Sequence, residues 1–597
     1  MAAPCGGSGF RRWLVLLFLF ANSLCSDQFN ESLLIKPLTS GHVISKFDFV
    51  IGTDNISGAH FHLVPRHLAE VISHHHVLEL HLSLTQGFWR HDIWGYPARQ
   101  AGTGAQLWVW FDPDTPSVDE SWSSLVNALS GLFCASLNFM DRTVTTSPEF
   151  AFRPAGVVSD PSELESRLLR VASLPREATC TENLTPWQKL LPCGAASGLS
   201  TLLNPTHLYS TSYHSLSVDF RPVCADTSCS RLRYEITQSV TLVHEPVTTP
   251  RRDGPRQDWS MKSLFGRGLY DACAVAERSD IFVDTAANGS YPFVLSPAPH
   301  SEVTSIVAGH TATYAAYSVT NLTSGGGGVN LRAAYSRPHR HGWTPSLPLT
   351  VTQYQTGSGQ YSVGLSLQLR NADRLSPLDV SVLQVVPWYI RLYLHTLQVT
   401  VDGQVIKPVY QRLVPGRDRQ RPYTLELGVR IPAGRVATVS VQAERAFLKW
   451  HEYPPDANHG FYLPGAVVSA LLPAQNCTRH PIRSPPVEGG RVFVRLSAEN
   501  QLVTLPTPDF SMPYNVICLV CTVVALAFGP LHNICTKRLL LVPVSEEKPG
   551  IAARIKSNLG RLMWWRRAAD QSDTASSQSP AEASQSSAAK VKSTKAD

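Results

Sequence analysis

The sequence predicts a mainly β fold, with β-sandwich-like modules, a few short helices and one transmembrane helix near the C-terminus. Apolar and polar residues alternate in many short runs, which are separated by Gly, Pro and Asp. The 597 residues include 43 Pro and 38 Gly, and only 16% are charged, which suits sandwiches with many turns better than helical bundles. A long uncharged run near the C-terminus meets the length of about 20 apolar residues that a membrane-spanning helix needs.

The N-terminus has the pattern of a secretory signal peptide, which we place at residues 1–26. Arg11 and Arg12 precede an apolar run at residues 13–21, and small residues suited to cleavage follow. An uncleaved anchor is the alternative, but this apolar run is too short to span a bilayer comfortably. The chain is therefore expected to enter the secretory pathway.

The transmembrane helix is expected at residues 514–536, after a linker at 506–513. This segment carries no charged side chain, and Lys537 and Arg538 follow it directly. A buried core helix is the alternative, which the basic pair and the polar flanking chain disfavour. Because positive residues stay on the cytosolic side, the tail at 537–597 should be cytosolic, basic at first and then disordered. The bulk of the chain is then luminal, in a single-pass type I arrangement.

The luminal part is expected to contain two domains. The first, at residues 27–275, should be mostly β with short helices, and the second, at 276–505, should be β-sandwich-like. Strand patterns recur throughout the second domain, including an aromatic run at residues 387–395.

Within the first domain, three segments carry clear periodicity. Strict alternation at residues 77–84 predicts a half-buried strand. Apolar residues at helical spacing predict a helix at 119–137, and a second short helix is expected at 161–172.

An aromatic loop that includes Phe88, Trp89 and Trp94 follows the first of these strands. Aromatic side chains this dense form either a local plug of the core or a binding surface. We keep all three residues as interface candidates.

Three consecutive histidines, His74–His76, raise the question of a metal site. Ligands must converge on the ion from one side, whereas successive residues of an extended chain point to opposite faces. We therefore expect a solvated loop here, and no metal or other cofactor is predicted.

The luminal cysteines are odd in number. They are Cys134, Cys180, Cys193, Cys224, Cys229, Cys273 and Cys477. In an oxidising compartment, an odd cysteine indicates an interchain bridge or a free thiol. Cys180 and Cys193 bracket a loop, so either they bond to each other or one of them is the odd cysteine. Cys224 and Cys229 resemble a hairpin bridge, and Cys134 and Cys273 are the other candidates for intrachain bonds.

Glycosylation sequons provide an independent test of the topology. They occur at Asn30, Asn55, Asn183, Asn288, Asn321 and Asn476, all on the expected luminal side. The Asn183 site is doubtful because Pro186 directly follows its Thr, so the other five are the glycosylation candidates.

The sequence contains none of the signatures that would identify an enzyme from its residues alone. It has no Gly-x-Ser-x-Gly elbow, no His-Glu-x-x-His pair and no phosphate-binding loop. A Cys/His dyad stays open, because both residue types occur. The net charge of +6 lies almost wholly in the tail, which argues against a nucleic-acid partner. A luminal assembly subunit, an adhesion or glycan-binding ectodomain at the cell surface, and a luminal hydrolase are therefore the competing functions.

Several long motifs occur along the chain: TQGFWR at 85–90, FCASLN at 133–138, CTENLTPW at 180–187, TSYHS at 211–215, VPWY at 386–389 and LPTPDFSMPYN at 505–515. Together they resemble the T subunits of the GPI transamidase complex, the PIG-T family. The resemblance runs from about residue 33 to the membrane span. It weakens at His74–His76, at residues 245–258, at the glycine run 325–328, around Cys477 and in the tail, so it assigns no role to Cys477.

The resemblance implies a non-catalytic subunit of an endoplasmic-reticulum complex that cleaves proproteins and joins the new C-terminus to GPI. A caspase-like partner, PIG-K, would supply the catalytic residues, and other subunits, the proprotein and the GPI lipid would be further partners. Members of the family hold PIG-K through an interchain disulfide, and the motif match assigns that bond to Cys180.

Overall fold

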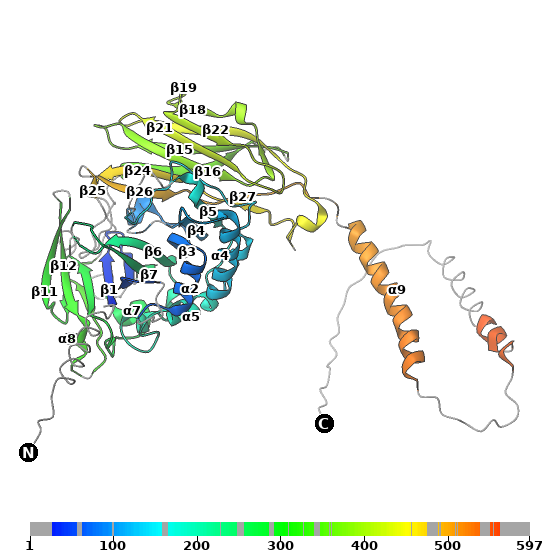
Figure 1. Cartoon of the computed structure of the whole chain (residues 1–597), viewed down its shortest axis with the longest axis horizontal. Helices are drawn as coiled ribbons and strands as arrows, with labels where there is room; N and C mark the ends of the chain where they lie inside the picture. Colours follow the sequence, from blue (N-terminus) through cyan, green and yellow to red (C-terminus); the bar gives the residue numbers. More distant parts are fainter. Residues whose placement is uncertain are drawn as a thin grey trace, which may run out of the picture. The chain divides into compact units, whose positions relative to one another are not determined.

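The computed structural model describes residues 27–56, 63–97, 99, 101–157, 165–226, 228–246, 256–285, 292–307, 310–325, 327–338, 347–357, 359, 361–454, 456–473, 487–488, 491–507, 509, 511–537, 550–552 and 554–560. It confirms a mainly β protein with few helices (Figure 1). The chain divides into two compact units, one ending at Pro508 and the other beginning at Asp509.

A ten-stranded sheet forms the centre of the first unit. In sheet order its strands are β11 (Ser301–Val307), β12 (His310–Ser318), β9 (Arg278–Asp284), β1 (Gln28–Pro37), β2 (Val43–Thr53), β7 (Leu232–His244), β6 (Tyr213–Cys224), β3 (Val77–Gln86), β4 (Gly104–Phe111) and β5 (Leu169–Leu174). The strand expected at 77–84 is therefore present as β3.

The first strand pairs with a strand from a distant part of the chain. β1 lies antiparallel to β2 and parallel to β9, with Leu33 opposite Phe47 on one side and Ile281 on the other. The sheet thus includes strands on both sides of residue 275, where the sequence suggested a domain boundary.

Helices cover one face of this sheet. Those nearest the site described below are α2 (Arg66–His74), α4 (Val118–Phe133) and α5 (Thr181–Lys189) (Figure 1). Successive side chains of a strand point to opposite faces of the sheet. On the helix-covered face, Leu107 and Val109 of β4 belong to one buried core with Leu125 of α4 and Trp187 of α5.

The opposite face of the sheet packs against a β-sandwich. Trp108 and Trp110 of β4 lie in a cluster with Leu383 and Val467 of the sandwich. One sheet of the sandwich contains β14 (Leu349–Thr356), β15 (Ser362–Asn371), β22 (Val436–Arg445), β18 (Gln398–Val401) and β19 (Gln404–Ile406), with β17 (Ile390–Leu392) beside β22. The other contains β20 (Tyr410–Val414), β21 (Tyr423–Ile431), β16 (Leu378–Val386), β24 (Val467–Pro473), β26 (Arg491–Ser497) and β25 (Val487–Glu488).

Smaller elements complete the first unit. They are the sheet of β10 (Phe293–Ser296), β13 (Arg332–Tyr335) and β8 (Trp259–Ser260), the pair β23 (Phe461–Leu463) and β27 (Gln501–Val503), and the helices α3 (His91–Trp94), α6 (Pro205–Leu208), α7 (Met261–Phe265) and α8 (Val319–Thr323).

Two predicted elements differ from those in the structure. The helix expected at 161–172 is wrong over its described part, since a 3₁₀ turn at Ser166–Leu168 leads into β5. Pairing with β4 determines this conformation, because Leu169 lies opposite Trp110 in the ladder. The aromatic strand expected at 387–395 is shortened to β17.

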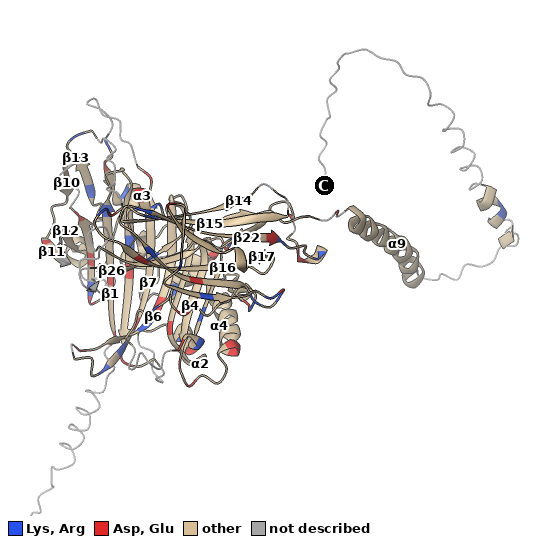
Figure 2. Cartoon of the chain, turned by 90° about the horizontal axis from the view of Figure 1, so that it is seen from above, with Lys and Arg blue, Asp and Glu red and all other residues tan. Residues whose placement is uncertain are grey.

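The second unit contains α9 (Ser511–Thr536), a helix of 26 residues that includes an 18-residue window of mean hydropathy 2.0 and has no Lys, Arg, Asp or Glu. Figure 2 shows no Lys, Arg, Asp or Glu along this helix. By length and composition, it can cross a membrane, as the sequence predicts.

Candidate functional site

Cys180 presents an exposed thiol at the start of α5. Its backbone is held at both ends by side chains. The N–H of Cys180 donates to Oδ1 of Asn183 at 3.0 Å, and the hydroxyl of Tyr209 donates to the carbonyl oxygen of Cys180. These contacts fix the backbone of Cys180, and the sulfur itself lies 3.5 Å from Oδ1 of Asn183.

Asn183 connects this thiol to the end of α4. Its Nδ2 donates to the carbonyl oxygens of Phe133 at 3.0 Å and of Cys134 at 2.8 Å. Cys134 closes α4 in the left-handed conformation, with φ of 50°, and is itself an exposed free thiol. A single buried amide group thus bridges the backbones of the two free cysteines that the structure describes in the first unit.

The polar side chains that bond to Cys180 and to its neighbour Thr179 are electrically neutral. Burial and the neighbouring Cys180 raise the pKa of Tyr209, so its hydroxyl keeps the proton that it donates. Burial lowers the pKa of His214 to about 4, and its neutral ring bonds through Nε2 to the hydroxyl of Thr179 at 2.8 Å. The nearest hydrogen-bond acceptor of the Cys180 sulfur is the amide oxygen of Asn183, at 3.5 Å, which is not a base.

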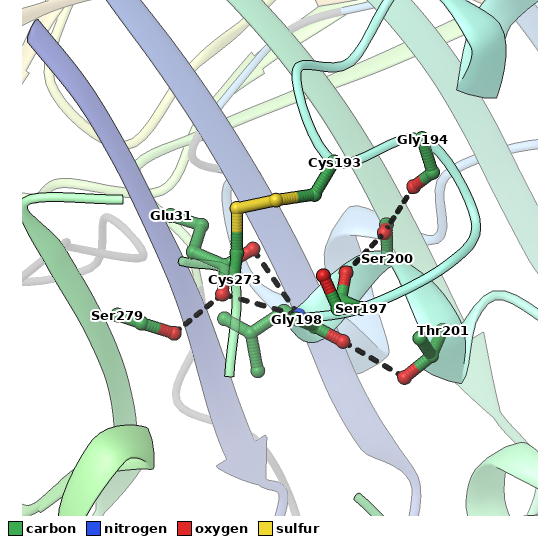
Figure 3. Close-up of a disulfide and its surroundings, with 10 residues drawn as sticks. Glu31, Cys193, Gly194, Ser197, Gly198, Ser200, Thr201, Cys273 and Ser279 are labelled. Atoms are coloured by element: carbon green, nitrogen blue, oxygen red, sulfur yellow. Dashed lines mark hydrogen bonds between the residues drawn. A yellow bond between two sulfur atoms is a disulfide. The ribbon is translucent and has the colours of Figure 1, made fainter. Parts of the chain in front are cut away.

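The loop that follows α5 is fixed by a disulfide between Cys193 and Cys273, whose Cα atoms lie 6.0 Å apart (Figure 3). A bond between Cys180 and Cys193, which the sequence left open, is therefore not formed. Sequence reasoning could not find the true partner because 80 residues separate the two cysteines.

Beside this bridge, the carboxylate of Glu31 lies against the backbone at Gly198 (Figure 3). It accepts hydrogen bonds from the N–H of Leu199 and the hydroxyl of Ser279. Burial raises the pKa of Glu31 from 4.5 to about 7, against the effect of these hydrogen bonds. The loop that leads from α5 is thus held by a covalent bond and by a buried acid.

The second disulfide joins Cys224 to Cys229, five residues apart at the turn between β6 and β7. It closes only a tight loop and leaves Cys180 and Cys134 as the free thiols among the described residues of the first unit. Cys477 lies outside the residues that the structure describes.

The two tryptophans of the aromatic loop lie in a buried cluster. Trp89 and Trp94 are 4% and 3% exposed, and both rings contact Tyr213 edge to face. Nε1 of Trp89 donates to the carbonyl oxygen of Gly95 at 2.7 Å. These two interface candidates are therefore interior residues of the unit, and Phe88 is half-buried beside them.

The histidine run is only partly solvated, although the sequence suggested a solvated loop for all three residues. His74, which ends α2, and His76 are exposed, whereas His75 is buried. Nδ1 of His75 donates to the carbonyl oxygen of Val71 at 2.8 Å, while Nε2 accepts from the hydroxyl of Ser124 at 3.0 Å. This ring therefore ties α2 to α4.

The sequons differ in their surroundings. Asn55 and Asn321 are exposed, whereas Asn30 is half-buried within β1, and Asn183 is buried. Asn288 and Asn476 lie outside the described residues. The exposed pair offers the best-placed acceptors for a glycan among the described sites.

Sequence reasoning missed the roles of Asn183 and Tyr209. An asparagine three residues after the N-cap residue Cys180 is a capping pattern, which could have identified the bond to Cys180. No local pattern predicts the bonds of Asn183 to the end of α4 or of Tyr209 to Cys180.

The whole chain is similar in sequence to several known proteins. Residues 13–563 match the family model described as Gpi16 subunit, GPI transamidase component. The chain is 41% identical to the GPI-anchor transamidase component PIGT of Mus musculus over 571 residues, covering 92% of this chain and 97% of that protein. The Homo sapiens PIGT is 41% identical with the same coverage. The GPI transamidase component GPI16 of Saccharomyces cerevisiae is 28% identical, covering 87% of this chain and 90% of that protein.

Proposed function

Because the chain belongs to the Gpi16 family of GPI transamidase components, we propose that it holds the catalytic subunit through an interchain disulfide at Cys180. In this proposal the chain supplies no catalytic residue. A caspase-like PIG-K subunit cleaves the proprotein and transfers its new C-terminus to GPI. This chain stabilises that subunit within the complex.

The observation that carries the proposal is the exposed thiol of Cys180, fixed by Asn183 and Tyr209. A thiol that is both accessible and oriented suits a covalent bond to another chain. A disulfide keeps two partners at high effective concentration when their non-covalent contacts open transiently. The nearest polar partner of its sulfur is an amide, which supports a bridging role over a Cys/His nucleophile.

We also propose that α9 spans the endoplasmic-reticulum membrane once, with the first unit in the lumen. The uncharged helix and the Lys537–Arg538 pair that follows it support this orientation. An adhesion ectodomain at the cell surface is not favoured, since the relatives that match the whole chain are transamidase components.

The bridge is tested by replacing Cys180 with Ser in the full chain, expressed together with PIG-K. We expect the loss of a reducible heavy band that contains both chains on a non-reducing gel. Cys134→Ser is the matched control, because it removes another exposed free thiol. An unchanged band in Cys180→Ser, or its loss in Cys134→Ser alone, would refute the assignment.

The location is tested through the glycans. Asn55→Gln and Asn321→Gln should each remove one glycan that remains sensitive to endoglycosidase H, as retention in the endoplasmic reticulum requires. Glycans that resist this enzyme would contradict retention, and a chain without glycans at either site would contradict the luminal placement.

A further inference from the structure

Asn183 belongs to a glycosylation sequon that the folded protein cannot use. Asn183, Leu184 and Thr185 form the acceptor pattern, and Asn183 is 1% exposed. Both hydrogen-bonding ends of its amide are occupied, since Oδ1 accepts from the N–H of Cys180 and Nδ2 donates to Phe133 and Cys134.

A glycan on Asn183 would destroy this arrangement. Glycosyl transfer from a lipid-linked oligosaccharide pyrophosphate forms a bond between Nδ2 and the sugar, while the amide loses one proton and the lipid pyrophosphate leaves. The amide would then keep one N–H for the two carbonyl oxygens that it now satisfies. The attached sugar would also need space between α4 and α5, where Asn183 is buried.

The residue after the sequon is a proline inside a helix. Pro186 is the sixth residue of α5, where it has no N–H to donate to the carbonyl of Glu182. Proline in a helix interior is far less favourable than alanine. Because Pro186 destabilises the helix that contains it, its presence at this position needs an explanation other than helix stability.

We infer that Pro186 keeps the Asn183 sequon unmodified, so that Asn183 can position the Cys180 thiol. In the nascent chain, proline biases the preceding Thr185 toward extended conformations, which keeps its hydroxyl from turning back toward the Asn183 amide. Once α5 forms, Asn183 fixes the backbone of Cys180 and links it to the end of α4. The positioning role rests on the proposed function, whereas the protection of the sequon does not.

The first test is Pro186→Ala in the full chain, expressed with PIG-K. We expect one additional glycan, seen as a mass shift that peptide N-glycosidase reverses. The glycosylated molecules should show at least a fivefold lower fraction in the disulfide-linked band. A Pro186→Ala chain without the extra glycan would overturn the inference, and so would a glycosylated chain that bridges normally.

The matched control is the double variant Pro186→Ala/Thr185→Ala, which removes the sequon again. Thr185 is exposed, and its hydroxyl bonds only within its own helix, to Thr181 at 2.9 Å. This variant should carry no extra glycan and should recover normal bridging. A persistent loss of bridging would mean that Pro186 itself shapes the site, which contradicts the inference.

A second variant separates positioning from general folding. Asn183→Asp retains an acceptor for the N–H of Cys180 but cannot donate to Phe133 and Cys134. Among molecules whose Cys193–Cys273 bond has formed, we expect at least a fivefold lower bridged fraction. Equal bridging in these folded molecules would refute the positioning role. Failure of Cys180→Ser to remove the band would instead refute the proposed function, leaving the glycan readout intact.

Discussion

The carboxylate of Glu31 accepts the backbone N–H of Leu199 at 3.1 and 3.2 Å, which joins β1 to a loop 168 residues later in the chain. The acid is 2% exposed, and the Cys193–Cys273 bond lies beside it (Figure 3). The protonation state of Glu31 therefore affects the stability of the loop that follows the candidate site.

Glu31 should make the protein less stable as the pH rises. Its pKa of about 7 lies above the ordinary value of 4.5, so its contribution is fully present below pH 4.5 and is lost as the pH rises through 7. The change amounts to about 3 kcal/mol. Glu31→Gln should flatten the dependence of the melting temperature on pH between 5 and 8, measured on the full chain in detergent. An unchanged profile would contradict the assignment of this dependence to Glu31.

Gly198→Ala should destabilise the same loop. Gly198 has a φ of +78°, and a Cβ there would lie 2.7 Å from the Glu31 carboxylate oxygens and 2.8 Å from Cβ of Cys273. We expect a loss of about 2–4 kcal/mol from the backbone strain and the clash together. Gly194→Ala separates the two effects, since Gly194 also has a positive φ but no atom within 4 Å of its Cβ position. Equal melting temperatures for the two variants would exclude a role for the clash.

Glu426 should be essential for the contact between the sandwich and the segment that follows α4. It is fully buried on β21 and accepts the N–H groups of Glu149, Phe150 and Ala151 at 2.9 to 3.3 Å. Arg412 donates to the same carboxylate at 2.8 Å. Glu426→Ala should cost about 3 kcal/mol, because it leaves three backbone N–H groups without their acceptor, whereas Arg412 keeps its contacts with Ser147 and Glu149.

The control for this prediction is Glu149→Gln, which removes an exposed ion pair with the same Arg412. Such a pair contributes about 0–1 kcal/mol. Chemical denaturation of both variants should therefore separate them clearly, and similar midpoints would show that the buried carboxylate is dispensable.

Trp89→Ala should act on folding and not on a docking surface. Trp89 is buried against Trp94 and Tyr213, so truncation should cost about 3–5 kcal/mol. Complex assembly should fall in proportion to the amount of folded chain, measured by formation of the Cys193–Cys273 bond. Phe88→Ala should have a much smaller effect on stability. A Trp89→Ala chain that folds normally but fails to assemble would restore the interface interpretation.

The sequence predicted those elements whose patterns are local. The period of two in β3 and the helical spacing in α4 identify themselves, because each depends on which face of one element is buried. β5 was missed because its conformation depends on pairing with β4, some 60 residues earlier in the chain. Where α4 ends also depends on a distant residue, since Asn183 satisfies the last carbonyls there.

The candidate site was predicted in part. The motif around Cys180 pointed to the thiol, but the pairing of Cys193 with Cys273 depends on how β1 and β9 bring distant loops together. The buried state of Trp89 and His75 could not be predicted either, because aromatic and histidine-rich stretches are common both in cores and on surfaces.

The pairing of β1 with β9 also sets the order in which the molecule can be completed during synthesis. When the first strand has been made, its parallel neighbour lies some 250 residues ahead, so one edge of β1 stays open until residue 284 has emerged from the ribosome. An open strand edge readily pairs with the wrong chain. The nascent protein therefore depends on protection of that edge throughout the interval, and variants that slow elongation in this region should increase aggregation even when the finished fold is unaltered.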